Sequence, residues 1–162
     1  MWYHPFMVII GVDPGTATTG IGVIEGTRQK GFKCIEYFCI TTPANSPIED
    51  RILHISTELT KTIQKHNPQV LALEELFFNK NPKTVMSVSR VSGAIILASA
   101  INNLKLKEFT PLEVKLAITG YGRAEKKQVQ LMIKTLLKLK EIPKPDDAAD
   151  GLAIALCAGI SL

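Results

Sequence analysis

The sequence lacks the features that would direct it to a membrane, to the cell exterior or to a zinc site. No apolar run among its 162 residues reaches transmembrane length, and no basic segment precedes an apolar core at the start. The cysteines, Cys34, Cys39 and Cys157, are odd in number and lack metal-ligand spacing, so we expect reduced structural thiols. The three histidines are scattered, which favours surface or structural roles. These absences predict a cytoplasmic protein without membrane contact and without a His/Cys metal centre.

Repeats, low-complexity tracts and long linkers are also absent. We therefore expect residues 1–162 to form a single domain with a sizeable core. A hydrophobic content of 46% and a charged content of 21% are typical of an ordinary globular protein.

The hydrophobic pattern predicts an α/β fold in which strands and helices follow the order β-β-β-α-β-α-β-α-α-α. That order favours a mixed five-stranded sheet with helices on both faces, its first three strands forming an antiparallel meander. Strands are expected over 8–13, 18–25, 32–40, 69–74 and 105–109. Helices are expected over 46–66, 82–102, a short segment from 110, 125–139 and the C-terminal segment. Asp146 is expected to cap the last helix, and Val129, Met132, Ile133 and Leu136 to face inward.

Four carboxylates lie in apolar surroundings, where an acid is costly unless it is paired, hydrogen-bonded or bound to a metal. Asp13 ends the apolar run 7–12, and Glu74 ends the apolar run 70–73. Asp147 and Asp150 open the apolar C-terminal segment. If acids on separate apolar elements converged, they would repel each other unless a cation lay between them. The pattern therefore predicts a divalent-metal site.

Each acid also has a simpler interpretation. Asp13 precedes Pro-Gly-Thr and could cap a turn. Glu75 lies beside the second acid, and only one of two neighbours on a strand can face the site. Asp146 would share a helix face with Asp150 as well as Asp147 does, and acids at a helix N-terminus are favoured by the dipole. Capping explains Asp150 poorly, because Gly-Leu-Ala-Ile-Ala-Leu follows it directly.

Positive charge is concentrated in residues 105–144, which hold ten Lys or Arg and four Glu, a net of +6 within a chain of net +4. A basic segment beside a cation-holding site suits a metal-dependent enzyme acting on a polyanion, although solvated helix faces explain the lysines equally well. Arg123, Lys126 and Lys127 cluster at a predicted helix start, a place suited to phosphate contacts. Phe77 follows the acid at 74 on a polar, basic loop, where its ring could stack on exposed bases, although adjacent aromatics are usually core.

Taken together, these segments resemble the RuvC family of Holliday junction resolvases. The matching stretches are Ile10-Gly-Val-Asp-Pro-Gly-Thr with Thr19-Gly-Ile-Gly-Val, Ala72-Leu-Glu-Glu-Leu-Phe with Lys80-Asn81, Gly120-Tyr-Gly-Arg-Ala-Glu-Lys-Lys-Gln-Val, and Asp147-Ala-Ala-Asp-Gly-Leu-Ala-Ile-Ala. Each motif is weak alone, but four in the same order and spacing are highly specific. The resemblance implies a ribonuclease-H-like fold and leaves residues 1–6 outside the family pattern as an N-terminal extension.

By position, the resemblance makes Asp13, Glu74, Asp147 and Asp150 the metal-binding catalytic acids, and so selects Glu74 over Glu75 and Asp147 over Asp146. It places Phe77 where the family has an aromatic that engages bases near the crossover. Lys115 and Lys126 fall at basic positions near the scissile phosphate. The full set of expected DNA contacts is Phe77, Lys80, Lys115, Arg123, Lys126 and Lys127.

The implied activity is that of a crossover junction endodeoxyribonuclease, which nicks four-way DNA junctions symmetrically and leaves 5′-phosphates in recombination and repair. Hard oxygen ligands suit Mg²⁺, with Mn²⁺ able to substitute, and two ions roughly 4 Å apart would serve phosphodiester hydrolysis. Two nicks need two sites, so a homodimer is expected, with the 82–102 helix as the hypothesis for its interface. A RuvA/RuvB-type branch-migration complex is a further expected partner.

Three other functions compete with this prediction. The stretch 13–22 also matches the phosphate loop of an actin-like phosphotransferase or ATPase, but that class needs two such domains and an adenosine site. A non-catalytic junction-binding module would not need all four acids. A ribonuclease-H-like nuclease acting on another branched or RNA-containing substrate is compatible with the same residues.

Overall fold

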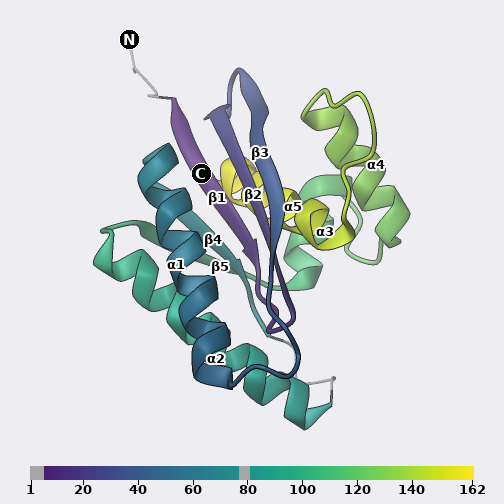
Figure 1. The fold of residues 1–162 in the computed structure, drawn as a ribbon. Coiled ribbons are helices and arrows are strands. Elements are labelled where there is room, and N and C mark those ends of the chain that lie inside the picture. Colours follow the sequence, from purple (N-terminus) through teal and green to yellow (C-terminus); the bar gives the residue numbers. More distant parts are fainter. Residues whose placement is uncertain (1–5, 77–80) are drawn as a thin grey trace.

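A mixed five-stranded sheet forms the centre of the molecule, as seen in the computed structural model, which describes residues 6–76 and 81–162 (Figure 1). Its strands lie in the order β3-β2-β1-β4-β5. Their bounds are β1 Met7–Asp13, β2 Thr18–Thr27, β3 Gly31–Thr41, β4 Val70–Glu74 and β5 Lys105–Phe109. The first three strands form an antiparallel meander, and β1, β4 and β5 run parallel to one another. The predicted order of elements and the mixed sheet are confirmed.

Helices cover both faces of the sheet and divide the core in two (Figure 1). One face packs against α1 (Ile48–His66) and α2 (Pro82–Ile101), and the other against α3 (Pro111–Thr119), α4 (Lys126–Leu136) and α5 (Asp146–Ser161). Alternation along β1 accounts for the division, because Ile9 faces the α5 side while Ile10 and Val12 face the α1 and α2 side. All three side chains are fully buried.

Helix α5 lies against β1 and β2 at backbone contact, and strand glycines make that approach possible. A methyl group on Gly11 would lie 2.9 Å from the Cα of Ala155, and one on Gly22 would lie 2.6 Å from the Cα of Leu152. At Gly20 a methyl group would overlap the carbonyl oxygen of Asp147. Glycine inside a strand often marks such a close backbone approach. The glycines thus determine how deeply α5 sits on the sheet.

Helix α2 is packed quite differently. It is long and apolar enough to span a membrane by length and composition alone, although only 28% of the relevant window is buried. The sequence prediction concerned an uninterrupted apolar run, and Arg90 and the serines do interrupt the apolar residues of α2. They do not lower the mean hydropathy of the helix enough to exclude it by composition. Met86, Leu97 and Ile101 are each at least 60% exposed. The helix therefore leaves an apolar surface in contact with solvent.

Two local predictions were wrong. Helix α4 ends at Leu136, which is 37% exposed, and the inward position falls to Leu137, which is 4% exposed, where the chain turns. Asp146 does not cap α5, since Pro145 holds that position and Asp146 is the first helical residue. Its carboxylate is instead engaged by side chains of α4.

Candidate active site

Three aspartates from two elements converge at one end of the sheet. Asp13, Asp147 and Asp150 each present a carboxylate oxygen, and the three oxygens lie within 4.8 Å of one another. Asp13 ends β1 and pairs with Gly20 across the ladder. Because Gly20 has no side chain, the first turn of α5 passes directly over it and brings Asp147 beside Asp13. Half-burial of all three aspartates excludes much of the water that would otherwise separate their charges.

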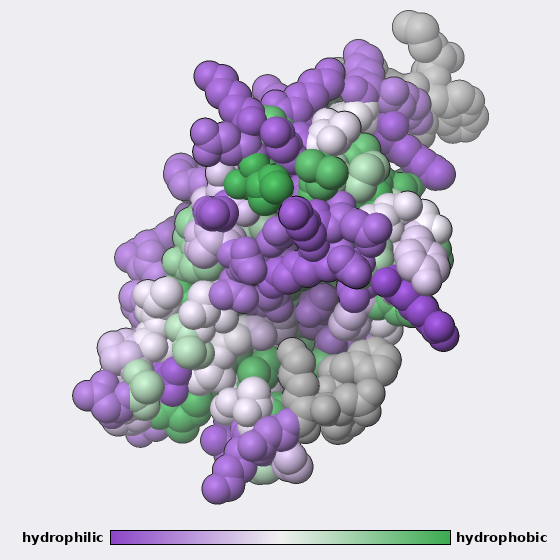
Figure 2. Space-filling model, turned by 90° about the vertical axis from the view of Figure 1, so that its right-hand side faces the viewer, coloured by the Kyte–Doolittle hydropathy of each residue, from purple (hydrophilic) through white to green (hydrophobic). Residues whose placement is uncertain are grey.

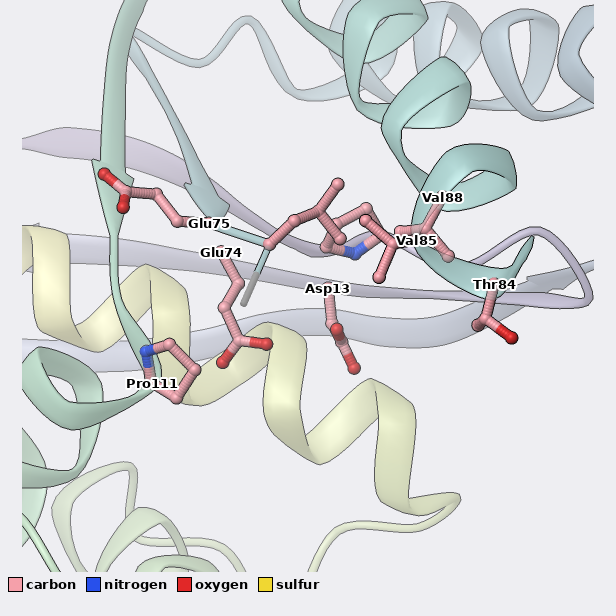
Figure 3. A pocket seen from close by; sticks show the side chains of 9 residues that line it. Asp13, Glu74, Glu75, Thr84, Val85, Val88 and Pro111 are labelled. Atoms are coloured by element: carbon pink, nitrogen blue, oxygen red, sulfur yellow. The ribbon is translucent and has the colours of Figure 1, made fainter. Parts of the chain in front are cut away.

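Glu74 reaches the same region from β4. The parallel register of β1 and β4 pairs Val12 with Leu73, so the next residue on each strand, Asp13 and Glu74, emerges at the same end of the sheet. Figure 3 shows the carboxylates of Asp13 and Glu74 pointing toward α5, whereas Glu75 points away. Asp13 and Glu74 line one cavity of about 90 Å³, and Glu74 and Asp150 line a second of about 200 Å³. The register therefore orients Glu74, not Glu75, toward the three aspartates.

Lys126 at the start of α4 contacts the acids of α5. Its Nζ lies 3.0 Å from Asp150 Oδ2 and 3.5 Å from Asp146 Oδ2. Gln130, one turn further along α4, donates a hydrogen bond of 3.0 Å to Asp146 Oδ1. Sequence reasoning placed Lys126 near a phosphate but missed this network. The spacing of four between Lys126 and Gln130 is the only sequence signal for it, and nothing in the sequence pairs them with α5.

The negative charge of the acidic cluster is only partly neutralised by nearby positive charge. Burial raises the pKa of Asp150, Lys126 lowers it in part, and Asp147 and Asp146 add repulsion that raises it again. Burial lowers the pKa of Lys126, but the ion pairs with Asp150 and Asp146 outweigh that effect and raise it. The pKa of Cys39 is raised by burial and further by the charges of Asp147, Asp13 and Asp150. A negative potential therefore extends over this end of the sheet.

The donor set fits a hard divalent cation. Asp13, Glu74, Asp147 and Asp150 offer only carboxylate oxygens, which suit Mg²⁺ or Mn²⁺ better than zinc. The acids come from β1, β4 and α5, each anchored in the core, so the donors are positioned before any ion binds. A cation bound here would also offset the burial and the repulsion that raise the pKa of Asp150.

Basic residues surround the acids on the side of α3 and α4. Lys115 and Lys126 line the second cavity together with Glu74 and Asp150. Arg123 and Lys127, which are close to Lys126 in the sequence, are exposed to solvent. Figure 2 shows hydrophilic residues gathered across the middle of this side of the molecule. Phe77 and Lys80, the other two predicted DNA contacts, lie outside the described residues.

Known proteins share both the sequence and this fold. The family model of the crossover junction endodeoxyribonuclease RuvC matches residues 9–158. The crossover junction endodeoxyribonuclease RuvC of Caldicellulosiruptor saccharolyticus is 51% identical over 151 residues, which cover 93% of this chain and 91% of that one.

Two solved structures agree with these matches. The Thermus thermophilus RuvC structure superposes with a TM-score of 0.86 at 32% identity, covering 93% of this chain and 92% of that one. Thermus thermophilus RuvC in complex with a Holliday junction substrate gives a TM-score of 0.89 at 31% identity, with the same coverage of both chains. The predicted ribonuclease-H-like fold is confirmed, and the chain belongs to the RuvC family.

Proposed function

We propose that this protein is a crossover junction endodeoxyribonuclease that resolves four-way DNA junctions by paired symmetric nicks, in homologous recombination and DNA repair. Membership of the RuvC family supports the proposal, as does a relative whose structure holds a Holliday junction substrate. The observation that carries it is the convergence of Asp13, Asp147 and Asp150, with Glu74 pointing to the same place. A non-catalytic junction-binding module would have no need of that arrangement.

Asp13, Glu74, Asp147 and Asp150 would hold two Mg²⁺ ions, with Mn²⁺ able to substitute. When bound, such ions supply an activated water and stabilise the leaving 3′-oxygen, which leaves a 5′-phosphate at each nick. The protein's own contribution is to hold the four carboxylates on rigid elements and to exclude water from around them. Lys115 and Lys126, on the cavity beside the acids, would hold the scissile phosphate in line with them.

A homodimer follows from the product, because two nicks placed symmetrically require two sites related by a two-fold axis. The α2 helix is proposed as the interface, and its exposed Met86, Leu97 and Ile101 support this role. Burial of the whole helix within the monomer would have contradicted the hypothesis, and the helix is not buried. A cytoplasmic location and a RuvA/RuvB-type branch-migration partner remain expectations from the family.

The experiment that tests the proposal is incubation with Mg²⁺ and a synthetic four-way junction. Wild-type protein should nick the junction in two symmetric places and leave linear duplex and an RNA/DNA hybrid intact. Asp13→Asn should abolish cleavage, because it removes a carboxylate charge from the proposed metal site without changing its shape, while junction binding survives. Cleavage of the hybrid instead of the junction would favour a ribonuclease-H-like activity on another substrate. Cleavage by Asp13→Asn at the wild-type rate would show that Asp13 is not one of the metal-binding catalytic acids.

A further inference from the structure

We propose that Lys126 is an internal counter-ion of the metal-binding acids, and that a divalent cation displaces its ammonium group from Asp150 onto Asp146. The inference rests on the proposed function, since it assumes that Asp150 is a metal ligand. Asp146 and Gln130 act as positioning residues, and neither has a role in the proposed cleavage chemistry. The displaced ammonium group remains beside the site, where it can contact a phosphate.

The contacts of Lys126 supply the two positions that the exchange requires. Its Nζ lies 3.0 Å from Asp150 Oδ2 and 3.5 Å from Asp146 Oδ2, so it is within ion-pair distance of both carboxylates at once. Movement of the ammonium group from one carboxylate to the other therefore needs only a small rotation of the side chain. About half of the lysine side chain is exposed, which leaves room for that rotation.

Gln130 prepares Asp146 as the second position. It donates a hydrogen bond of 3.0 Å to Asp146 Oδ1, while Lys126 contacts the other oxygen, Oδ2. The amide therefore fixes the carboxylate and leaves the lysine-facing oxygen available. Gln130 and Lys126 lie one turn apart on α4, so both side chains reach α5 from the same face.

Charge makes the exchange necessary. Asp150 shares its cluster with Asp13 and Asp147, and in the metal-free protein the lysine supplies positive charge to this group. An ammonium group and a divalent cation on the same carboxylate would repel each other at close range. Cation binding therefore favours the state in which Lys126 rests on Asp146, and metal binding is coupled to the placement of a phosphate-binding side chain.

The test measures Mn²⁺ binding without DNA, by the electron paramagnetic resonance signal of the free ion. Lys126→Ala should bind Mn²⁺ more tightly than wild type, by roughly two- to fivefold, the equilibrium equivalent of losing an exposed competing ion pair. The same variant should cleave a junction more slowly. A residue that only contacts DNA would leave Mn²⁺ affinity unchanged, and one that supports the metal would weaken it. Lys126→Gln, which keeps most of the side chain, should repeat the result.

Lys127→Ala is the matched control, because it removes the same charge from the adjacent, exposed position. Within the described part of the chain, Lys127 makes no ion pair with the acids, so its removal should leave Mn²⁺ affinity close to that of wild type. If Lys126→Ala and Lys127→Ala increased Mn²⁺ affinity equally, the effect would come from the overall charge of the protein. That result would overturn the proposed exchange. Failure of wild type to bind Mn²⁺ at all would overturn the proposed metal site instead, so the two failures are distinguishable.

Gln130→Ala tests the positioning role without changing any charge. In the wild-type background it should weaken Mn²⁺ binding by up to about twofold, because a less ordered Asp146 is a poorer alternative partner for Lys126. In the Lys126→Ala background the same substitution should have no effect, since its action runs through the lysine. Effects of equal size in both backgrounds, including none, would show that Gln130 does not act through Lys126.

Discussion

Helices α5 and α2 have similar apolar compositions. Their places in the fold differ, as Figure 1 shows. Eleven of the 16 residues of α5 are buried, whereas four of the 20 residues of α2 are. Small residues of α5 meet the glycines of β1 and β2 at backbone contact, while α2 packs on α1 and β5 and leaves one side open. The comparison teaches that apolar content does not decide burial. The closely packed helix carries Asp147 and Asp150, and the open helix leaves apolar side chains in contact with solvent.

The largest effect is expected from breaking the close contact of α5. Gly20→Ala should lower the free energy of unfolding by about 1–3 kcal/mol or more, because the added methyl group overlaps the backbone carbonyl of Asp147. Moving α5 away would also separate Asp147 from Asp13, so junction cleavage should fall with stability. Urea denaturation followed by circular dichroism measures the first effect, and nicking of a synthetic junction measures the second.

Gly93→Ala in α2 is the matched control for this prediction. A methyl group on Gly93 meets nothing within 4 Å, so the substitution should raise the free energy of unfolding by about 0.5–1 kcal/mol through better helix propensity. If both substitutions changed stability equally, the proposed difference between the two helices would be wrong.

A smaller effect is expected from placing charge on the open helix. Leu97, on α2, is 60% exposed, so Leu97→Lys should leave the monomer folded while it weakens the proposed dimer by roughly tenfold or more. Sedimentation velocity over a range of protein concentrations measures the association. Leu131→Lys on α4 is the control, since Leu131 is 54% exposed and belongs to another surface. A dimer that survives Leu97→Lys with unchanged affinity would exclude this part of α2 from the interface.

The same contrast explains what could be predicted from the sequence. Apolar runs and helical spacing located the elements of the described residues, since the apolar run of β1 and the spacing in α1 are local properties of the chain. The clustering of Asp13, Asp147 and Asp150 was predictable because each acid borders an apolar run. The register of β4 against β1 was not, and it is this register that orients Glu74 rather than Glu75.

Asp146 and Gly20 have partners that lie far away in the chain, which sequence reasoning could not identify. Asp146 resembles a helix cap because acids are favoured at a helix N-terminus, yet its partners Lys126 and Gln130 come from α4. Gly20 carried a readable signal, since glycine inside a strand often marks a close backbone approach, but its neighbour Asp147 lies on a distant helix. Local pattern thus predicts which residues are unusual, and tertiary packing decides their partners.

The smallest effect concerns the cost of holding an acid on the buried helix. Burial raises the pKa of Asp150 above its ordinary value, so the folded state disfavours the ionised form and loses stability as the pH rises through the folded-state pKa. Without metal at neutral pH, Asp150→Asn should therefore raise the melting temperature by about 1–3 °C. The gain should disappear at a pH below the ordinary pKa of aspartate, because the wild-type carboxyl is then neutral in both states.

Asp50→Asn on α1 is the matched control, since Asp50 is an exposed acid in a first helical turn on the opposite face of the sheet. There the carboxylate interacts favourably with the helix dipole and stabilises the helix. Its loss should therefore lower the melting temperature slightly, by about 1 °C. Added Mg²⁺ should then reverse the order for Asp150, because wild type gains stability from the bound cation and Asp150→Asn gains less. A melting temperature of Asp150→Asn below that of wild type without metal would mean that the ion pair with Lys126 outweighs burial. In that case α5 would hold the ionised Asp150 without a loss of stability.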